Sequence, residues 1–295
     1  MQPADFLSAV FFYLKVGENL NQNWIVENLN NEFSTWNGKL GELWGLVTTG
    51  PQTFKGGAVW SVMQTLHNGM VGIGYALVVL FFAISLCKNT MNFHELKRPE
   101  AAIHYFLRFV AAKTLVGYGM DIMLNVFSIC NGIVTDMADS MGGISEAMVS
   151  LPTEMQTAIE NVEFLASIPL WLVTILGSLF ITVLSFVMIL TVYGRFFRLY
   201  MYTALAPLPL AAFAGENTQS VGISFLKSYV GVCLEGAVIV LACVIYSAFV
   251  STPTVASGEA TTIVWSYLAE TVFNMLVLVG LIKGSDRIIH EMMGL

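Results

Sequence analysis

The stretch Val192–Gly215, VYGRFFRLYMYTALAPLPLAAFAG, predicts a membrane helix that is interrupted part-way. It places Arg195 and Arg198 beside an apolar run and then interrupts the run with Pro207 and Pro209. Each proline lacks a backbone donor and disfavours helical angles in the residue before it. Broken backbone at membrane depth is tolerated only where protein or water covers it. We therefore expect a cavity or a subunit interface at this point.

The composition of the whole chain is that of a membrane protein. Of its 295 residues, 56% are hydrophobic and 11% are charged, and the mean hydropathy is +0.71. Soluble domains carry about 25% charged residues, so we predict an all-α, polytopic integral membrane protein. The sequence contains no phosphate-binding loop, no HExxH motif, no GxSxG motif and no CxxC pair. Neither enzymatic activity nor a metal or cofactor site is therefore expected.

Residues 1–62 are expected to form two external amphipathic helices followed by a linker. Apolar residues recur there at roughly helical spacing, and three tryptophans, Trp24, Trp36 and Trp44, lie within 21 residues. This pattern suits either a membrane surface or packing against neighbouring subunits. Gly50-Pro51 and Gly56-Gly57 mark the linker.

Residues 63–134 are expected to hold the first two spans. We place these spans at 69–87 and 114–134, because a helix needs about 20 apolar residues to cross the hydrocarbon core. Residues 88–113 carry five basic and two acidic residues. By the positive-inside rule this loop is cytoplasmic and the N-terminus lies outside. Three glycines at the start of the first span permit close helix contact: Gly69, Gly72 and Gly74.

Residues 135–167 are expected to form an acidic external loop. The segment contains six acidic residues and no lysine or arginine. Within it, Ser150-Leu-Pro152-Thr-Glu154 predicts the start of a surface helix covering 152–165.

Residues 168–295 are expected to hold three further spans and a proline-broken hairpin at about 199–227. The three spans are placed at 168–192, 229–250 and 263–282. A re-entrant or kinked hairpin on the cytoplasmic side leaves Lys283 and Arg287 inside, which satisfies every charge cluster with five spans and an internal C-terminus. The alternative is a proline-kinked sixth span at 196–214, which would place both basic residues outside.

Three carboxylates lie within predicted spans: Asp121, Glu235 and Glu270. A carboxylate at this depth is unfavourable and normally faces a bundle interior, an aqueous path or a partner. Two interpretations stay open. The carboxylates either hydrogen-bond to polar side chains of other helices or line a polar passage as channel or assembly residues.

Arg195, Arg198 and Tyr202 share one helical face at the expected cytoplasmic boundary. They form either a snorkelling anchor or a site that pairs with a partner's carboxylates or guides a phosphate backbone. Under the second hypothesis the partner-contact residues are Tyr193, Gly194, Arg195, Arg198, Tyr200, Tyr202, Pro207 and Pro209.

The segment Tyr193–Glu216, YGRFFRLYMYTALAPLPLAAFAGE, resembles the TrbL-like polytopic inner-membrane subunit of type IV secretion and conjugation machines, in the form carried by Gram-positive mobile elements. The resembling features are the tyrosine-glycine-arginine entry, the tyrosines after it and the alanine-proline-x-proline turn. Phe54–Leu77, FKGGAVWSVMQTLHNGMVGIGYAL, is similar to the family's helix leading into its first span. Asp121 also matches an aspartate in the family's second span.

This resemblance implies a non-enzymatic channel or scaffold subunit that crosses the cytoplasmic membrane several times. It further implies a homo-oligomer, through or beside which DNA with its attached relaxase leaves the donor cell. Separate ATPases would supply the energy, and the Ala206–Pro209 turn would contact neighbouring subunits or those ATPases. A rival hypothesis from the residues is an ion-coupled transporter or ion channel, since broken helices beside midplane carboxylates are typical of ion-coupled sites. A membrane enzyme is the third hypothesis.

The five-span topology predicts that the loop at 251–262 lies outside the cell. A cysteine in place of Glu259 should react with a membrane-impermeant maleimide on intact cells, whereas a cysteine in place of Lys97 should react only after lysis. Reaction of the cysteine at position 259 only after lysis would favour the six-span alternative.

Overall fold

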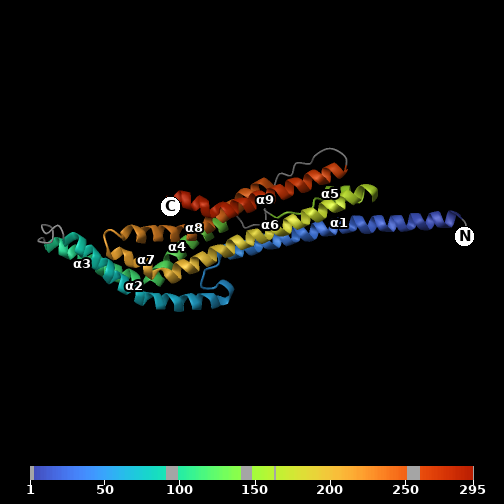
Figure 1. Ribbon diagram of the computed structural model, residues 1–295. Coiled ribbons are helices and arrows are strands. Elements are labelled where there is room, and N and C mark those ends of the chain that lie inside the picture. The colour runs from blue at the N-terminus through green and yellow to red at the C-terminus, as the bar shows by residue number, and fades with distance from the viewer. Residues whose placement is uncertain (1–2, 91–98, 141–147, 163, 251–259, 295) are drawn as a thin grey trace. The chain divides into compact units, whose positions relative to one another are not determined.

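The described part of the chain is helical. The computed structural model describes residues 3–90, 99–140, 148–162, 164–250 and 260–294, and all regular structure within them is helix (Figure 1). The long helices are α1 (Pro3–Thr48), α2 (Ala58–Thr90), α6 (Phe164–Leu205), α8 (Gln219–Val250) and α9 (Ala260–Met293). The shorter ones are η1 (Phe54–Gly57), α3 (Pro99–Gly117), α4 (Gly119–Ser140), α5 (Thr153–Glu160), α7 (Pro207–Ala211) and η3 (Ala212–Ala214).

Four helices in the described residues are long and apolar enough to cross a membrane. Their candidate spans are Phe54–Lys88, Ile168–Leu205, Gln219–Ala248 and Thr262–Met293. The predicted second span at 114–134 is not among them, because it is divided between α3 and α4, which meet at Tyr118. The helical fold class is confirmed, whereas the count of five spans and their orientation stay predictions.

Parts of the predicted loops lie outside the described residues. These parts are 91–98 of the basic loop, 141–147 of the acidic segment and 251–259 of the loop that distinguishes the two topologies.

The N-terminal region is one helix, and the prediction of two helices is wrong. α1 continues to Thr48 before the chain turns. Residues 15–23, between the two clusters of apolar residues, contain a single glycine, Gly17, and no proline. A lone glycine inside a helix costs about 1 kcal/mol without ending it, which explains the continuous helix.

The turn between α1 and α2 explains the FKGG sequence. Lys55, Gly56 and Gly57 have φ angles of 48°, 74° and 77°, in the left-handed region that favours glycine. A Cβ atom on Gly57 would lie 2.9 Å from the carbonyl oxygen of Gln52, so this position also lacks room for a side chain. The predicted linker is therefore a tight turn with defined geometry.

Two predicted boundaries differ from the structure. α5 begins after Pro152 as expected but ends at Glu160, short of the predicted end at 165. α6 extends to Leu205, so the predicted third span and the first arm of the hairpin form one continuous helix. The reason is that Gly194 is the sole helix-weakening residue between Val192 and Leu205.

The chain turns between α6 and α8 over residues 206–218. Ala206 keeps helical angles (φ −49°, ψ −38°), so the expected loss of helical angles before Pro207 is wrong. The bias before proline is a preference that packing overrides. α6 nevertheless ends at Leu205, two residues before Pro207, which has no N–H to continue the hydrogen bonding. Gly215 (φ −107°, ψ 140°) is the point where the backbone becomes extended.

The described residues form two compact units, each assembled from segments far apart in the sequence. The first unit is Met1–Gly45, Met141–Thr191 and Leu241–Lys283, and the second is Leu46–Ser140, Val192–Val240 and Gly284–Leu295. The predicted four-part division concerns membrane topology and stays a prediction.

The first unit connects α1 to α6 and to the segment before α5. The hydroxyl of Thr182 on α6 donates to the carboxylate of Glu32 on α1 at 3.1 Å. The Asn37 amide donates to the carbonyl oxygen of Val149 and accepts from its N–H. This part of the predicted acidic loop is therefore attached to α1.

In the second unit α7 packs against both α2 and α3 (Figure 1). The contact depends on Gly74 of α2, because a Cβ atom there would lie 2.9 Å from Val116 Cγ1 and 3.0 Å from Pro207 Cβ. Gly69 and Gly72 have no such neighbour within 4 Å. Of the three glycines predicted to allow close contact, only Gly74 does so within the described chain.

Gly74→Ala should therefore destabilise the protein by about 1–3 kcal/mol, since the added methyl group overpacks the contact with Pro207. Thermal unfolding of the detergent-purified protein measures this change. Gly72→Ala on the same helix is the matched control, and it should leave the melting temperature unchanged or raise it. Equal melting temperatures for both variants would contradict the packing argument.

Candidate functional site

The side chain of Arg195 is completely buried in the second unit. Its Nε, Nη1 and Nη2 atoms donate to the carbonyl oxygens of Val232, Val47 and Cys233, at 3.2, 3.3 and 3.1 Å. A guanidinium stays charged in proteins, and burying it without partners would be strongly unfavourable. The three carbonyls take the place of water, so α6 is joined to α8 and to the end of α1. A snorkelling anchor keeps its charged group in water at the membrane surface, so the complete burial of Arg195 does not fit that interpretation.

The end of α1 is a natural partner for Arg195. The last carbonyls of a helix have no partner within the helix and carry partial negative charge. Two further donors hold the same region. Asn131 Nδ2 donates to the carbonyl oxygen of Thr48 at 3.2 Å, and the Tyr200 hydroxyl donates to that of Pro51 at 2.9 Å. Side chains from α4 and α6 therefore replace the hydrogen bonds that the helix end lacks.

Gly236 makes room for the guanidinium on α8. A Cβ atom at this position would lie 2.8–3.0 Å from the Nη1, Nη2 and Cζ atoms of Arg195. Because the guanidinium is buried and bonded on three sides, it has little freedom to move away.

Arg198, one turn after Arg195, forms an ion pair with Glu235 of α8. Its Nη2 atom lies 2.7 Å from both carboxylate oxygens, and the Glu235 side chain is 1% exposed. Nη1 of Arg198 pairs with Asp286, and the hydroxyl of Ser285 donates to Glu235 Oε1 at 3.1 Å. A buried ion pair is stable where further hydrogen bonds satisfy its charged atoms, and Glu235 meets that condition.

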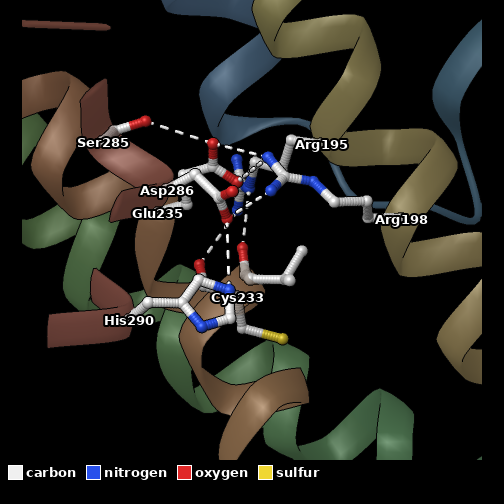
Figure 2. A network of polar contacts seen from close by, with 8 residues as sticks. Arg195, Arg198, Cys233, Glu235, Ser285, Asp286 and His290 are labelled. Atoms are coloured by element: carbon white, nitrogen blue, oxygen red, sulfur yellow. Dashed lines mark hydrogen bonds and ion pairs between the residues drawn. The ribbon is translucent and has the colours of Figure 1, made fainter. Parts of the chain in front are cut away.

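These contacts form a network in which the Arg198 guanidinium pairs with two carboxylates, one turn away from Arg195. Figure 2 shows Ser285, Asp286 and His290 of α9 on the opposite side from Arg195 and Arg198, and His290 Nε2 lies 3.6 Å from Asp286 Oδ1. The network joins α6, α8 and α9 within the second unit. Its geometry suits holding helices together, because each carboxylate is already bonded to a guanidinium that keeps its charge.

The aromatic residues of the predicted contact segment also pack internally. The Phe54 ring of the FKGG turn stacks on Phe196 with centroids 4.0 Å apart and meets Tyr193 edge-on at 5.3 Å. On the other side of α6, Tyr202 lies 5.5 Å from Phe225 of α8 between ring centroids. The motif thus packs against the α1–α2 turn and against α8.

None of the eight predicted contact residues is exposed in the described chain. Arg195, Tyr200 and Pro207 are buried, and the others are half-buried: Tyr193, Gly194, Arg198, Tyr202 and Pro209. Their observed contacts lie within the second unit, and a direct contact with a partner stays a prediction.

The three predicted carboxylates have different surroundings. Glu235 hydrogen-bonds to side chains of two other helices, which is the first of the two interpretations. Asp121 is exposed on α4 and lines a cleft. Glu270 lies half-buried on α9 in the first unit.

Sequence reasoning missed Gly236, Ser285, Asp286 and His290. The last three follow the fifth predicted span, where Lys283 and Arg287 served only as markers of topology. The available signal was the i, i+4 spacing of Asp286 and His290 next to a small polar residue. Among the described residues, no group of three or more His, Cys, Asp or Glu side chains is placed to hold a metal ion.

A family model described as TrbL/VirB6 plasmid conjugal transfer like protein matches residues 36–207, which is more than half of the chain. The matched range contains the FKGG turn, Asp121, Arg195 and Arg198 and ends at Pro207. Comparisons with curated proteins and with solved structures found no match.

Glu235→Gln should destabilise the protein by roughly 1–3 kcal/mol, because Arg198 loses its buried carboxylate partner and keeps only Asp286. Chemical unfolding in detergent micelles measures the change. The matched control is Glu291→Gln, which removes an exposed pair with Arg287 and should change stability by about 1 kcal/mol or less. Similar effects for the two variants would contradict the role assigned to the network.

Gly236→Ala should lower the melting temperature, because the new methyl group displaces the Arg195 guanidinium from its carbonyls. Gly284→Ala serves as control, since no atom outside the local helix lies within 4 Å of its added Cβ and the gain in helix propensity is the same. The melting temperature of Gly236→Ala should be clearly the lower of the two, and the reverse order would disprove the close-approach argument.

Proposed function

We propose that this chain, which belongs to the TrbL/VirB6 family of plasmid conjugal transfer proteins, is a non-enzymatic scaffold subunit of the membrane channel in a conjugal DNA-transfer machine. The family is a structural component of conjugation and is not known as an enzyme family. The family match over residues 36–207 carries the proposal, and it confirms the resemblance seen in the sequence.

The charge network supports a scaffold role. Arg195 and Arg198 join α6 to α1, α8 and α9 through buried contacts that are unfavourable to break. Such contacts hold helices in one arrangement while a substrate or a partner acts on the assembly.

The exposure of the candidate spans supports assembly in a membrane as a homo-oligomer. Only 17% of the apolar window of α2 is buried within the chain, against 56% for α8. A helix with so much apolar surface outside its own chain packs against lipid or other helices. In the proposed assembly α2 faces the lipid or a neighbouring copy, and α8 is a central helix of the protomer.

The proposal assigns energy supply to separate ATPases and the substrate to DNA with its attached relaxase. Arg195 and Arg198 have no DNA-contacting role in it, because one is fully buried and the other is bonded to two carboxylates. The turn at 206–209 is assigned to contacts with neighbouring subunits or ATPases.

Deleting the gene in a donor strain should abolish transfer, counted as transconjugants per donor, and a wild-type copy in trans should restore it. A copy with both Pro207→Ala and Pro209→Ala should insert normally but restore only a small fraction of transfer, because α6 is then free to extend past Leu205. Pro169→Ala, near the start of α6, is the matched control and should restore transfer fully.

Unchanged transfer after the deletion would contradict the proposed function. Normal transfer with the double proline variant would remove only the turn from the mechanism. Solute-dependent currents from the purified protein in vesicles, without partner proteins, would favour the transporter hypothesis instead.

A further inference from the structure

A cleft in the second unit lies between the α1–α2 turn and one face of α4, outside the charge network. Its volume is about 560 Å³, within the range of roughly 300–1,000 Å³ that small-molecule sites span. The polar residues that line it are Gln52, Asp121, Asn125, Ser128 and Asn131.

The polar residues of α4 form a continuous strip along the cleft. Asp121, Asn125 and Ser128 follow one another at i, i+4 and i+7, so they share one helical face. No hydrogen bond or ion pair joins the side chains of these three residues, or that of Gln52, to another residue in the part of the chain that the structure describes. Four polar side chains around one cleft are thus available to a ligand.

Asn131 adds an acceptor to the same cleft. Its Nδ2 atom donates to the carbonyl oxygen of Thr48, while its Oδ1 atom is buried and has no hydrogen-bond partner in the described chain. A buried acceptor without a donor is unfavourable, which marks this end of the cleft as incompletely satisfied.

The walls of the cleft are held before any ligand arrives. The carbonyl oxygen of Pro51 accepts from Tyr200, and that of Thr48 accepts from Asn131. Phe127 packs under Gly50, since a Cβ atom on that glycine would lie 3.8 Å from its ring. A preformed site loses little conformational freedom on binding.

The charge of the lining selects the class of ligand. Asp121 is the sole ionisable residue among those that line the cleft. Its carboxylate and the Asn131 Oδ1 atom accept hydrogen bonds, so they favour a cation with donors and repel a phosphate backbone. A bare metal ion fits the cleft less well, because among the described residues no group of three or more His, Cys, Asp or Glu side chains is placed to hold one. Leu124 and Phe127 suit the aliphatic stem of a long basic side chain.

We propose that this cleft binds a lysine or arginine side chain from a basic segment of another protein subunit. Asp121 pairs with its charged group, and Asn125 and Ser128 supply further hydrogen bonds. The identity of the occupant as a subunit of the transfer machine rests on the proposed function, whereas the chemistry of the cleft does not.

The test uses the full-length protein in nanodiscs of neutral phosphatidylcholine, which excludes attraction of the probe to anionic lipid. The probe is a short fluorescein-labelled peptide that contains two arginines among glycines, and binding is measured by fluorescence anisotropy. The same peptide with citrulline in place of arginine keeps the shape and removes the charge. The arginine peptide should bind, and the citrulline peptide should bind at least about tenfold more weakly.

Two variants locate the binding site of the probe. Asp121→Asn should weaken binding by about tenfold or more, and Ser128→Leu should weaken it by filling the cleft without touching the carboxylate. Asp139→Asn is the matched control, because Asp139 is an exposed carboxylate on the same helix outside the cleft, and it should bind the probe like wild type. Thermal unfolding of each variant establishes that it is folded.

Wild-type binding by Asp121→Asn, equal binding of the citrulline peptide, or an equal loss in Asp139→Asn would each overturn the proposal. So would a single-stranded oligonucleotide that binds at a site sensitive to Asp121→Asn. Because the assay does not involve transfer, its failure leaves the proposed function standing. Unchanged transfer after gene deletion would likewise leave the chemistry of the cleft intact.

Discussion

The second unit depends on the burial of one permanent charge, the guanidinium of Arg195. A charge in this position is tolerated only if other groups replace its water, and three backbone carbonyls do so. Two of these carbonyls belong to α8, whose close approach requires Gly236. The third belongs to the last turn of α1, so the same side chain holds the end of α1 against α6. The α1–α2 turn, and with it one wall of the cleft, follows from that position.

The two arginines, one turn apart on α6, bind different kinds of group. Arg195 is bonded to carbonyls, whereas Arg198 is bonded to the carboxylates of Glu235 and Asp286 and thereby brings α9 into the unit. The two negative charges of Glu235 and Asp286 offset the repulsion between the two neighbouring guanidinium groups. Asp121, Asn125 and Ser128, whose side chains have no partner within the described chain, lie elsewhere, on one face of α4. A subunit of a larger assembly needs both properties, a helix arrangement that stays closed and a surface that accepts another chain.

Much of the fold follows from local pattern, and less of the site does. The apolar runs predicted the long helices, the glycines of the FKGG turn predicted a break, and Pro207 predicted the end of a helix. The arginines and Glu235 were recognised as unusual, but their pairing was not. The local sequence around a basic residue beside an apolar run is the same in both cases, whether the side chain snorkels to a membrane surface or is buried against carbonyls. The two-helix prediction for residues 1–62 failed because the polar stretch between its two apolar clusters contains no residue that ends a helix.

By itself the sequence determined that this is a helical membrane protein without a recognisable catalytic motif, because composition, apolar run length and turn residues act locally along the chain. It also contained the motifs by which the family resemblance was found. Only the tertiary structure decided that Arg195 is buried, that Arg198 is the partner of Glu235, and that Asp121 faces a cleft. These outcomes join residues 37 to 148 positions apart in the sequence. No periodicity specifies such pairs, since they depend on which helix ends need donors and which helices approach closely enough to supply them.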